Sequence, residues 1–265
     1  MRLFRYDLPL LTSPLPLSVR SGLLLQTEQG WGEIAPLPGF SKETFEEALE
    51  DLERQQLPSV QFGFTSLQKP FPKSFPEISI SALASSLEEA SEAISAGFRT
   101  LKIKAKTPEE TLRLLSCIEK PPSLQLRIDV NRKWSFPEAA FFFKNLDPSN
   151  LEYVEEPVND PDTIAELPPL PIALDETLLQ EDAEQFCSLP HVVALVLKPT
   201  LLGNRINRFL LMKKKLVFSS SFESPIGLMH IAHMQKHYAP QHAAGLDTAR
   251  YFKELGSQWF TELVL

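Results

Sequence analysis

The stretch FRTLKIKAK (98–106) combines the pattern of a buried β-strand with two charges on one face of that strand. Leu101 and Ile103 are apolar, and Ile103 is β-branched, which favours a strand. Lys102 and Lys104 stand at alternate positions, so a strand directs both ammonium groups to the same side. Whether that side is a functional site depends on what the other apolar runs of the chain place beside it.

Further runs of the same kind recur along the chain, and most end in a polar or charged residue. They are ISISAL (78–83), LQLRIDVN (124–131), LEYVEE (151–156), PIALDE (171–176), VVALVLK (192–198) and KLVFSSS (215–221). The polar ends, from Lys104 to Ser221, follow one another at intervals of 20 to 26 residues. A strand with a returning helix needs about this length, because a parallel crossover takes about a dozen residues or more.

The segments between these runs have helical character. Apolar residues at three- and four-residue spacing, with Pro or an acid near the start, occur in PEETLRLLSCIEK (108–120), FPEAAFFFKNL (136–146) and PDTIAEL (161–167). Alternating helices and buried strands predict a parallel sheet covered by helices. Residues 78–245 have room for about seven units of ~24 residues, and no glycine-rich phosphate loop follows a strand. We therefore predict an α/β fold, a slightly truncated TIM-type (β/α)7β barrel, rather than an open doubly wound sheet.

Residues 1–77 follow a different pattern. PLPLSVRSGLLLQTEQGWGEIAPL (14–37) predicts two antiparallel strands around a polar turn at 28–30. SKETFEEALEDLERQQ (41–56) predicts a helix with Ser41 as its N-cap. We predict a small α+β domain in residues 1–77, completed by residues 246–265, whose apolar groups are left over once the barrel (78–245) is built.

The composition excludes several classes of protein. A net charge of -8 argues against a nucleic-acid binder that neutralises phosphates. The two cysteines, Cys117 and Cys187, fit a reducing cytosol better than a disulfide framework. No run approaches the ~18 apolar residues of a membrane helix. We expect a cytoplasmic protein with no nucleic-acid or membrane partner, and the sequence leaves open whether it is a monomer or a homo-oligomer.

The predicted barrel brings five charged residues together, because the chemistry of such barrels lies at the carboxyl ends of the strands. In chain order they are Lys104, Asp129, Glu155, Asp175 and Lys198. Three carboxylates in a low-dielectric mouth cannot all stay ionised without a cation, and oxygen ligands suit Mg²⁺. Each charge alone is more often a solvated strand end, but five in register favour a site.

The lysines would flank the carboxylates from opposite sides. A lysine acts as a base near neutral pH where burial or a like charge lowers the pKa of its ammonium group. Lys102 brings such a charge to the face that carries Lys104. Mg²⁺ with a lysine base is the arrangement that removes a proton next to a carboxylate and stabilises the resulting enediolate.

The residues around these strand ends match a known family. Its motifs are found in GWGEIAPLPGFSKET (30–44), PSVQFG (58–63), LKIK (101–104), LRIDVNRKW (126–134), VEEP (154–157), ALDET (173–177), LKPTLLG (197–203), SSSFESPIGL (219–228) and GLDT (245–248). With these motifs the chain resembles the enolase superfamily in its muconate-lactonising branch, and most closely the o-succinylbenzoate synthase family of menaquinone biosynthesis. The resemblance covers nearly the whole chain.

This resemblance implies roles for the strand ends. Asp129, Glu155 and Asp175 would hold Mg²⁺, with Mn²⁺ as a substitute. Lys104 would take the α-proton and then, as its ammonium, help the hydroxyl leave in a syn-dehydration, while Lys198 would stabilise the dienediolate from the opposite face. The small-molecule substrate would be 2-succinyl-6-hydroxy-2,4-cyclohexadiene-1-carboxylate and the product o-succinylbenzoate.

The resemblance also implies that the first domain is a capping domain. Its loop PLPGFS (36–41), with Gly39, Phe40 and Ser41, would close over the succinyl chain of the substrate. Gly245, in the GLDT motif, is a further candidate for substrate contact.

Other residues are candidates for substrate binding or for support of the metal ligands. They are Lys102, Arg127, Asn131, Glu176, Ser219, Ser220 and Ser221. The serines end a strand and would hold a substrate carboxylate, and Asn131 and Glu176 would orient ligands. Arg127 either orders the metal ligands, neutralises the substrate or forms a purely structural ion pair. Lys102 tunes the base, contacts the substrate carboxylate, or does both.

Two other functions stay open. An N-acylamino acid racemase or dipeptide epimerase of the same superfamily needs the same two lysines, so the catalytic residues do not discriminate between the reactions. The GLDT and SSSFES segments favour the synthase. A degenerate member kept as a binding protein is disfavoured by the intact set of lysines and acids.

Overall fold

The apolar runs form one curled parallel sheet in the structure, a computed structural model that describes residues 1–11, 17–253 and 259–263. Within these residues the strands of this sheet lie in chain order: β4 (Ala82–Ala84), β5 (Thr100–Lys104), β6 (Gln125–Asp129), β7 (Leu151–Glu155), β8 (Ile172–Leu174), β9 (Val192–Leu197) and β10 (Lys215–Phe218). All neighbours pair in parallel. Each predicted run overlaps one of these strands, although the first run (78–83) overlaps β4 only at residues 82 and 83.

A two-residue stretch joins the two edges of this sheet. Ala244 forms a parallel bridge with Ile80, just before β4, and Gly245 forms one with Ser219, just after β10. A side chain at position 245 would press on Ser219, since an added Cβ would lie 2.6 Å from the Oγ atom and 3.0 Å from the Cβ atom of Ser219. Residues 244 and 245 thus serve as a minimal eighth strand, and the (β/α)7β barrel is closed as predicted.

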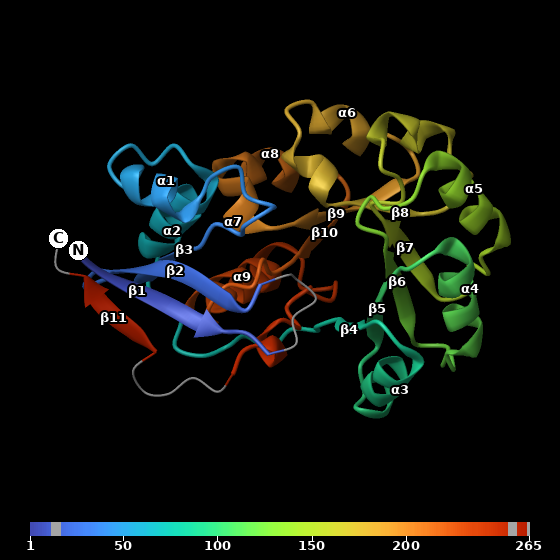
Figure 1. Ribbon diagram of the computed structural model, residues 1–265, viewed down its shortest axis with the longest axis horizontal. Helices are drawn as coiled ribbons and strands as arrows, with labels where there is room; N and C mark the ends of the chain where they lie inside the picture. The colour runs from blue at the N-terminus through green and yellow to red at the C-terminus, as the bar shows by residue number, and fades with distance from the viewer. Residues whose placement is uncertain (12–16, 254–258, 264–265) are drawn as a thin grey trace.

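The outer face of the sheet is covered by helices of very unequal length (Figure 1). The first half carries α3 (Leu87–Ser95), α4 (Pro108–Cys117) and α5 (Phe136–Asn145). The second half carries η1 (Pro161–Glu166), η2 (Glu176–Leu179), α6 (Ala183–Cys187), α7 (Pro199–Leu202), η3 (Gly203–Arg205), α8 (Ile206–Leu210) and α9 (Pro225–Tyr238). The segment 161–167, predicted as an α-helix, is the 3-10 helix η1, because the prolines of LPPLP (167–171) end it after six residues.

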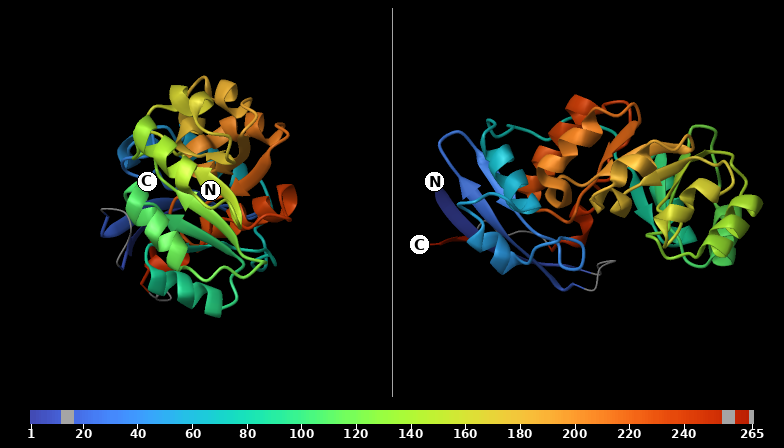
Figure 2. Two further views of the ribbon diagram at one scale, coloured as in Figure 1. Left: turned by 90° about the vertical axis from the view of Figure 1, so that its right-hand side faces the viewer. Right: turned by 90° about the horizontal axis from the view of Figure 1, so that it is seen from above.

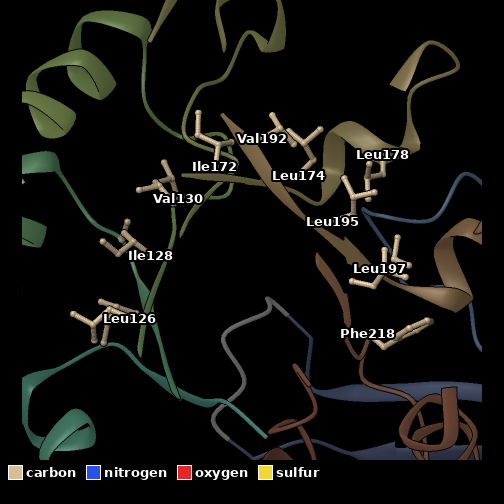
Figure 3. Close-up of a cluster of buried hydrophobic side chains, with 14 of the residues drawn as sticks. Leu126, Ile128, Val130, Ile172, Leu174, Leu178, Val192, Leu195, Leu197 and Phe218 are labelled. Carbon is tan, nitrogen blue, oxygen red and sulfur yellow. The ribbon is translucent and has the colours of Figure 1, made fainter. Parts of the chain in front are cut away.

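The core follows the alternation of the strands. Figure 3 shows Leu126 and Ile128 of β6 with Leu195 and Leu197 of β9 among the side chains that pack outside the sheet. The alternate positions face into the barrel, where a small apolar cluster of Tyr153, Ala173, Ala194, Val196 and Val217 fills the interior. The same alternation points Asp129 inward, above this cluster.

The N-terminal part forms a separate layer at one end of an elongated molecule (Figure 2). Its antiparallel sheet has the order β11 (Phe260–Leu263), β1 (Arg2–Pro9), β2 (Val19–Gln26) and β3 (Trp31–Ile34), and it packs against α1 (Phe45–Glu50) and α2 (Pro58–Leu67). The strands β2 and β3 and their turn agree with the sequence prediction. Strand β1 was not predicted, since prolines follow its pattern closely, but it pairs with β2 over eight residues.

The helix predicted at 41–56 is shorter than expected. Thr44 is the N-cap of α1 and forms a capping box with Glu47. Ser41 is not the cap: its hydroxyl accepts a hydrogen bond from the Leu37 amide at 2.8 Å inside the preceding loop. The sequence contained the correct signal, because Thr44 is the hydroxyl residue with a glutamate three positions later.

The C-terminal part leaves the barrel and returns to the first sheet. After Gly245 the chain forms η4 (Ala249–Tyr251), and β11 pairs antiparallel with β1. Residues 254–258 and 264–265, which belong to the predicted extension of the first domain, lie outside the described residues. In the described parts of the chain, no helix has the length and apolar character needed to cross a membrane.

Candidate active site

The charged strand ends meet at the carboxyl end of the barrel. Sheet register places Lys104 beside Asp129 and Asp129 beside Glu155. The Nζ atom of Lys104 lies 2.6 Å from Oδ2 of Asp129. The Nζ atom of Lys102 lies 3.0 Å from the same oxygen and 2.7 Å from Oε1 of Glu155. Two lysines of one strand therefore approach the carboxylates from the same side, as the alternation predicts.

The other end of the row is a second ion pair. Lys198 follows β9 and donates a hydrogen bond to Oδ2 of Asp175, which follows β8. The Nζ atom of Lys198 also lies 5.9 Å from the centre of the Phe40 ring. A loop of the N-terminal domain thus reaches a charged group of the barrel, and the five predicted strand ends form one continuous arc from Lys104 to Lys198.

Burial and crowding shift the pKa values of this arc. Burial alone would raise the pKa of Asp129, but Lys102 and Lys104 hold it well below its ordinary value. Burial, together with Glu176 and Glu155, raises the pKa of Asp175 against the effect of Lys198. Although burial opposes their charge, the neighbouring carboxylates raise the pKa values of Lys102 and Lys198. The negative charges therefore depend on cations for their stability.

The predicted ligands can be tested for their fit to a metal ion. All three are hard oxygen donors, and Asp129, Glu155 and Asp175 are at most 4% exposed. Oε2 of Glu155 is buried and has no hydrogen-bond partner among the residues that the structure describes. In the same described ranges, no three His, Cys, Asp or Glu side chains are grouped closely enough to hold a metal as they stand, because the lysines lie between the carboxylates. The donor set and the unpaired oxygen fit Mg²⁺, and binding would replace ammonium contacts.

Two predicted supporting residues link the two ends of the arc. Oδ1 of Asn131 accepts a hydrogen bond from Lys104 at 2.7 Å, and its Nδ2 donates to Oε1 of Glu176 at 3.2 Å. Asn131 has a left-handed backbone (φ 50°), a conformation that asparagine adopts more readily than most residues. The structure thus brings both residues to the mouth, where they connect Lys104 with the segment that carries Asp175.

Glu156 also supports the site, although sequence reasoning passed over it. It is fully buried, with a left-handed backbone (φ 46°), and its carboxylate accepts hydrogen bonds from the amides of Asp175 at 2.6 Å and Thr177 at 2.8 Å. Burial, with a contribution from Glu176, raises its pKa to about 7. The sequence signal for Glu156 was the pair of acids in VEEP (154–157). Strand alternation directs only the first of them, Glu155, into the barrel.

The three serines after β10 have different environments. Ser220 is internally satisfied: its hydroxyl donates to Oε2 of Glu223 at 2.7 Å and accepts from Thr248 at 2.8 Å. The Ser219 hydroxyl donates a long bond of 3.2 Å to the carbonyl of Gly245. Ser221 is 1% exposed, and its hydroxyl has no partner in the described parts of the chain. Among the predicted substrate contacts of this turn, Ser221 is therefore the hydroxyl most free to bind a ligand.

Arg127 lies one pleat below the carboxylates and does not contact them. Its Nε donates to Glu152 at 2.7 Å and its Nη1 to the carbonyl of Ala243 at 2.9 Å, and the guanidinium lies 5.1 Å from the centre of the Tyr153 ring. The register between β6 and β7 shifts at this point, so that Leu126 pairs with Leu151 and Arg127 with Tyr153. Of the roles considered for Arg127, the structural ion pair is the one for which the structure provides a partner.

The loop 36–41 and a cavity border the mouth. Gly39 has a left-handed backbone (φ 83°) and open space around it, which suits a tight exposed loop. Beside Lys104 a cavity of about 260 Å³ opens between the start of α3 and α4. Its lining is Ser85, Ser86, Leu87, Lys104, Lys106, Glu110, Thr111 and Leu114.

Comparisons with known proteins cover both parts of the chain. Residues 85–256 match the family of enolase C-terminal domain-like domains, and residues 1–69 match the MenC N-terminal domain. The chain is 32% identical over 288 residues to the o-succinylbenzoate synthase of Yersinia enterocolitica, an alignment that covers 93% of this chain and 89% of that protein.

Solved structures show the same likeness. The crystal structure of o-succinylbenzoate synthase from Thermosynechococcus elongatus BP-1, complexed with magnesium in its active site, matches with a TM-score of 0.79 and 29% identity, over 98% of this chain and 96% of that one. The dipeptide epimerase of Enterococcus faecalis V583 matches with a TM-score of 0.77 over 99% of this chain and 95% of that one, at 17% identity. That second likeness is one of fold alone.

Proposed function

The chain belongs to the enolase superfamily and, within it, to the o-succinylbenzoate synthase family, and on this basis we propose that it carries out a magnesium-dependent syn-dehydration of 2-succinyl-6-hydroxy-2,4-cyclohexadiene-1-carboxylate. The product is o-succinylbenzoate, an intermediate of menaquinone biosynthesis. Family membership makes the protein a carbon–oxygen lyase. The arc of Lys104, three buried carboxylates and Lys198 at the barrel mouth supports removal of a proton next to a carboxylate, a step that the epimerase alternative shares. The observation that favours the dehydration is the 32% identity to an o-succinylbenzoate synthase over 93% of the chain.

Lys104 is the proposed base and acid. Its neutral amine takes the proton from the carbon next to the ring carboxylate, and the C–H electron pair moves toward that carboxylate, from which it returns to the ring as the hydroxyl leaves. The ammonium that results then gives its proton to the hydroxyl as the C–O bond breaks, so water leaves from the same face. The side chain is suited to this, because it is 30% exposed at the mouth while its partner Asp129 is 1% exposed.

The remaining residues bind and orient. Lys198 places a positive charge on the side opposite Lys104, where it stabilises the negative charge that develops on the ring carboxylate. Asn131 holds Lys104 by its amide oxygen, and Glu156 fixes the backbone of Asp175. Lys102 lies between Asp129 and Glu155 in this structure, and from the same face as Lys104 it acts on the charge of Lys104 or on the substrate carboxylate.

Asp129, Glu155 and Asp175 are the residues that would hold Mg²⁺, and Mn²⁺ is the proposed substitute. When bound, the metal ion supplies Lewis-acid stabilisation of a carboxylate that gains negative charge. The buried, unpaired Oε2 of Glu155 supports this assignment from the protein side.

The succinyl chain of the substrate would extend toward the N-terminal domain. We propose that residues 1–77 with 246–265 cap the barrel, which the pairing of β11 with β1 supports. The loop 36–41 would cover the chain, and Ser221 would receive its carboxylate. We also propose the cytoplasm as the place of action, because two free thiols suit a reducing compartment.

The test is an assay of the purified protein with the cyclohexadiene substrate, in the presence of Mg²⁺ or of EDTA. We expect o-succinylbenzoate to form only with the divalent ion. An absence of product with Mg²⁺, accompanied by racemisation of an N-succinylamino acid, would assign the chain to the epimerase alternative instead.

A further inference from the structure

A buried arginine joins two loops of the proposed substrate site. Arg20 lies on β2 of the N-terminal domain and is 1% exposed. Its Nε donates to the carbonyl of Phe222 at 3.1 Å, in the turn that follows Ser221. Its Nη1 donates to the carbonyl of Pro36 at 2.7 Å, and its Nη2 donates to the carbonyl of Ala35. One guanidinium thus connects the loop 36–41, and Ala35 just before it, with the serine turn (219–222).

This contact crosses the boundary between the two parts of the molecule. The serine turn belongs to the barrel, and Phe222 within it has a left-handed backbone (φ 61°), a conformation that a bulky residue keeps only when the surroundings hold it. Glu223 holds the turn from the barrel side, since its carboxylate accepts from the amide of Ser221 at 2.7 Å. Arg20 holds the same turn from the side of the N-terminal domain.

The partners of Arg20 are all carbonyl groups. Its fourth hydrogen bond goes to the carbonyl of Ser21 at 3.1 Å, and within the described residues it forms no salt bridge with a carboxylate. A planar fork of donors in fixed directions can satisfy several carbonyls at once, which an ammonium group on a flexible chain does less well. The geometry, more than the charge alone, therefore sets the distance between the two loops.

We propose that Arg20 is a positioning residue for substrate recognition. It holds the loop 36–41 against the serine turn so that both meet the second carboxylate of the substrate, which lies at the end of the succinyl chain. The inference rests on the proposed function. It predicts that Arg20 affects the binding of the succinyl chain and leaves the proton transfer at Lys104, on the far side of the mouth, unchanged.

The experiment compares Arg20→Lys with the wild type in the presence of Mg²⁺. We expect KM for the cyclohexadiene substrate and Kd for o-succinylbenzoate, measured by calorimetry, to rise about tenfold, which equals about 1.4 kcal/mol. We expect kcat to stay within about threefold and the Kd of benzoate, which lacks the succinyl chain, to stay the same. Equal weakening of both ligands, or an unchanged KM in a folded variant, would overturn the proposal.

Tyr6→Phe is the matched control. Tyr6 is buried in the same interface, and its hydroxyl donates a hydrogen bond to Glu33 rather than to a carbonyl of either loop. The Tyr6→Phe variant should have a lower melting temperature and an unchanged KM. A rise of KM equal to that of Arg20→Lys would show that any loss of interface stability raises KM, and it would overturn the proposal.

Ser221→Ala provides a second route to the same answer. If Arg20 acts through the serine turn, the effects on KM of Ser221→Ala and of Arg20→Lys should be less than additive in the double variant. Full additivity would contradict the proposal. Where Arg20→Lys fails to fold, Arg20→Gln takes its place in the cycle. If the wild-type protein neither turns over the substrate nor binds o-succinylbenzoate, the proposed function itself is wrong. If the wild type is active and its Arg20 variants behave normally, only the role of Arg20 is wrong.

Discussion

The barrel mouth and the interface between the two domains both bury charged groups, but they satisfy them differently. At the mouth, Glu155 and Glu176 each keep one buried oxygen without a partner among the described residues. At the interface, the carboxylate of Glu33 receives four hydrogen bonds, from Tyr6, from the amide and hydroxyl of Ser224, and from the amide of Gly227.

This difference separates two uses of buried charge. A buried polar atom that lacks a partner costs free energy, about 1–3 kcal/mol, and persists where a ligand uses it. A carboxylate with all its partners in place stabilises the packing of one element on another. We infer that the mouth is built for ligands and the interface for stability, and the following predictions test that division.

The largest expected effect is at the mouth. Lys104→Ala removes the proposed base and should lower kcat by about 10²–10⁴-fold, the range that general acid–base groups contribute. The measurement is a steady-state assay of o-succinylbenzoate formation. Mg²⁺ affinity should remain, because Lys104 is not among the proposed ligands, and a variant that keeps substantial activity would show that the base is another residue.

Removal of the metal comes next. EDTA should abolish turnover, and added Mg²⁺ should restore it. Because Mg²⁺ would bind the folded chain alone, it should also stabilise the fold, by about 2.7 kcal/mol at one hundred times its Kd. Thermal unfolding with and without Mg²⁺ checks this, and an unchanged melting temperature at saturating Mg²⁺ would argue against a site made of Asp129, Glu155 and Asp175.

The smallest expected effect concerns the interface and pH. The Nε2–H group of His230 on α9 donates a hydrogen bond to the carbonyl of Trp31 at 2.8 Å, and burial lowers the pKa of His230 below its ordinary value, with smaller contributions from Lys69 and His233. The unfolded chain then binds more protons than the folded chain near pH 6, so stability should fall as pH drops below about 6.5.

Replacement by glutamine tests this dependence. His230→Gln should reduce the loss of stability between pH 7 and pH 5, because glutamine has no group that takes up a proton in this range. Chemical denaturation at both pH values measures it. His237→Gln is the control, since His237 is exposed on the same helix, and equal slopes in all three proteins would remove His230 from the account.

The sequence was sufficient to predict the elements that repeat along the chain. The alternation of Lys102 and Lys104, and the regular return of polar strand ends, placed the barrel strands and the arc of charges, because period-two burial is a local property of a strand. It failed where local signals compete. Segment 161–167 has helical spacing but too few residues before its prolines, and Thr44 rather than Ser41 caps α1.

The remaining site residues depend on contacts that no local pattern reveals. Glu33 meets Ser224 across 191 positions of the chain, and Arg20 meets Phe222 across 202. The difference between Ser220 and Ser221 likewise arises from Glu223 and Thr248, which tie up only one of two identical hydroxyls. Such distinctions need the fold.

The most direct test of the division between mouth and interface is a paired measurement on two isosteric variants, Glu155→Gln and Glu33→Gln, each assayed for kcat and for melting temperature. Glu155→Gln should lose activity by at least about 10³-fold and change the melting temperature little. Glu33→Gln places an amide NH₂ against buried donors, so it should destabilise the fold by about 3 kcal/mol while the folded fraction keeps its kcat. The reverse pattern, with Glu155→Gln active but unstable and Glu33→Gln stable but inactive, would contradict the account.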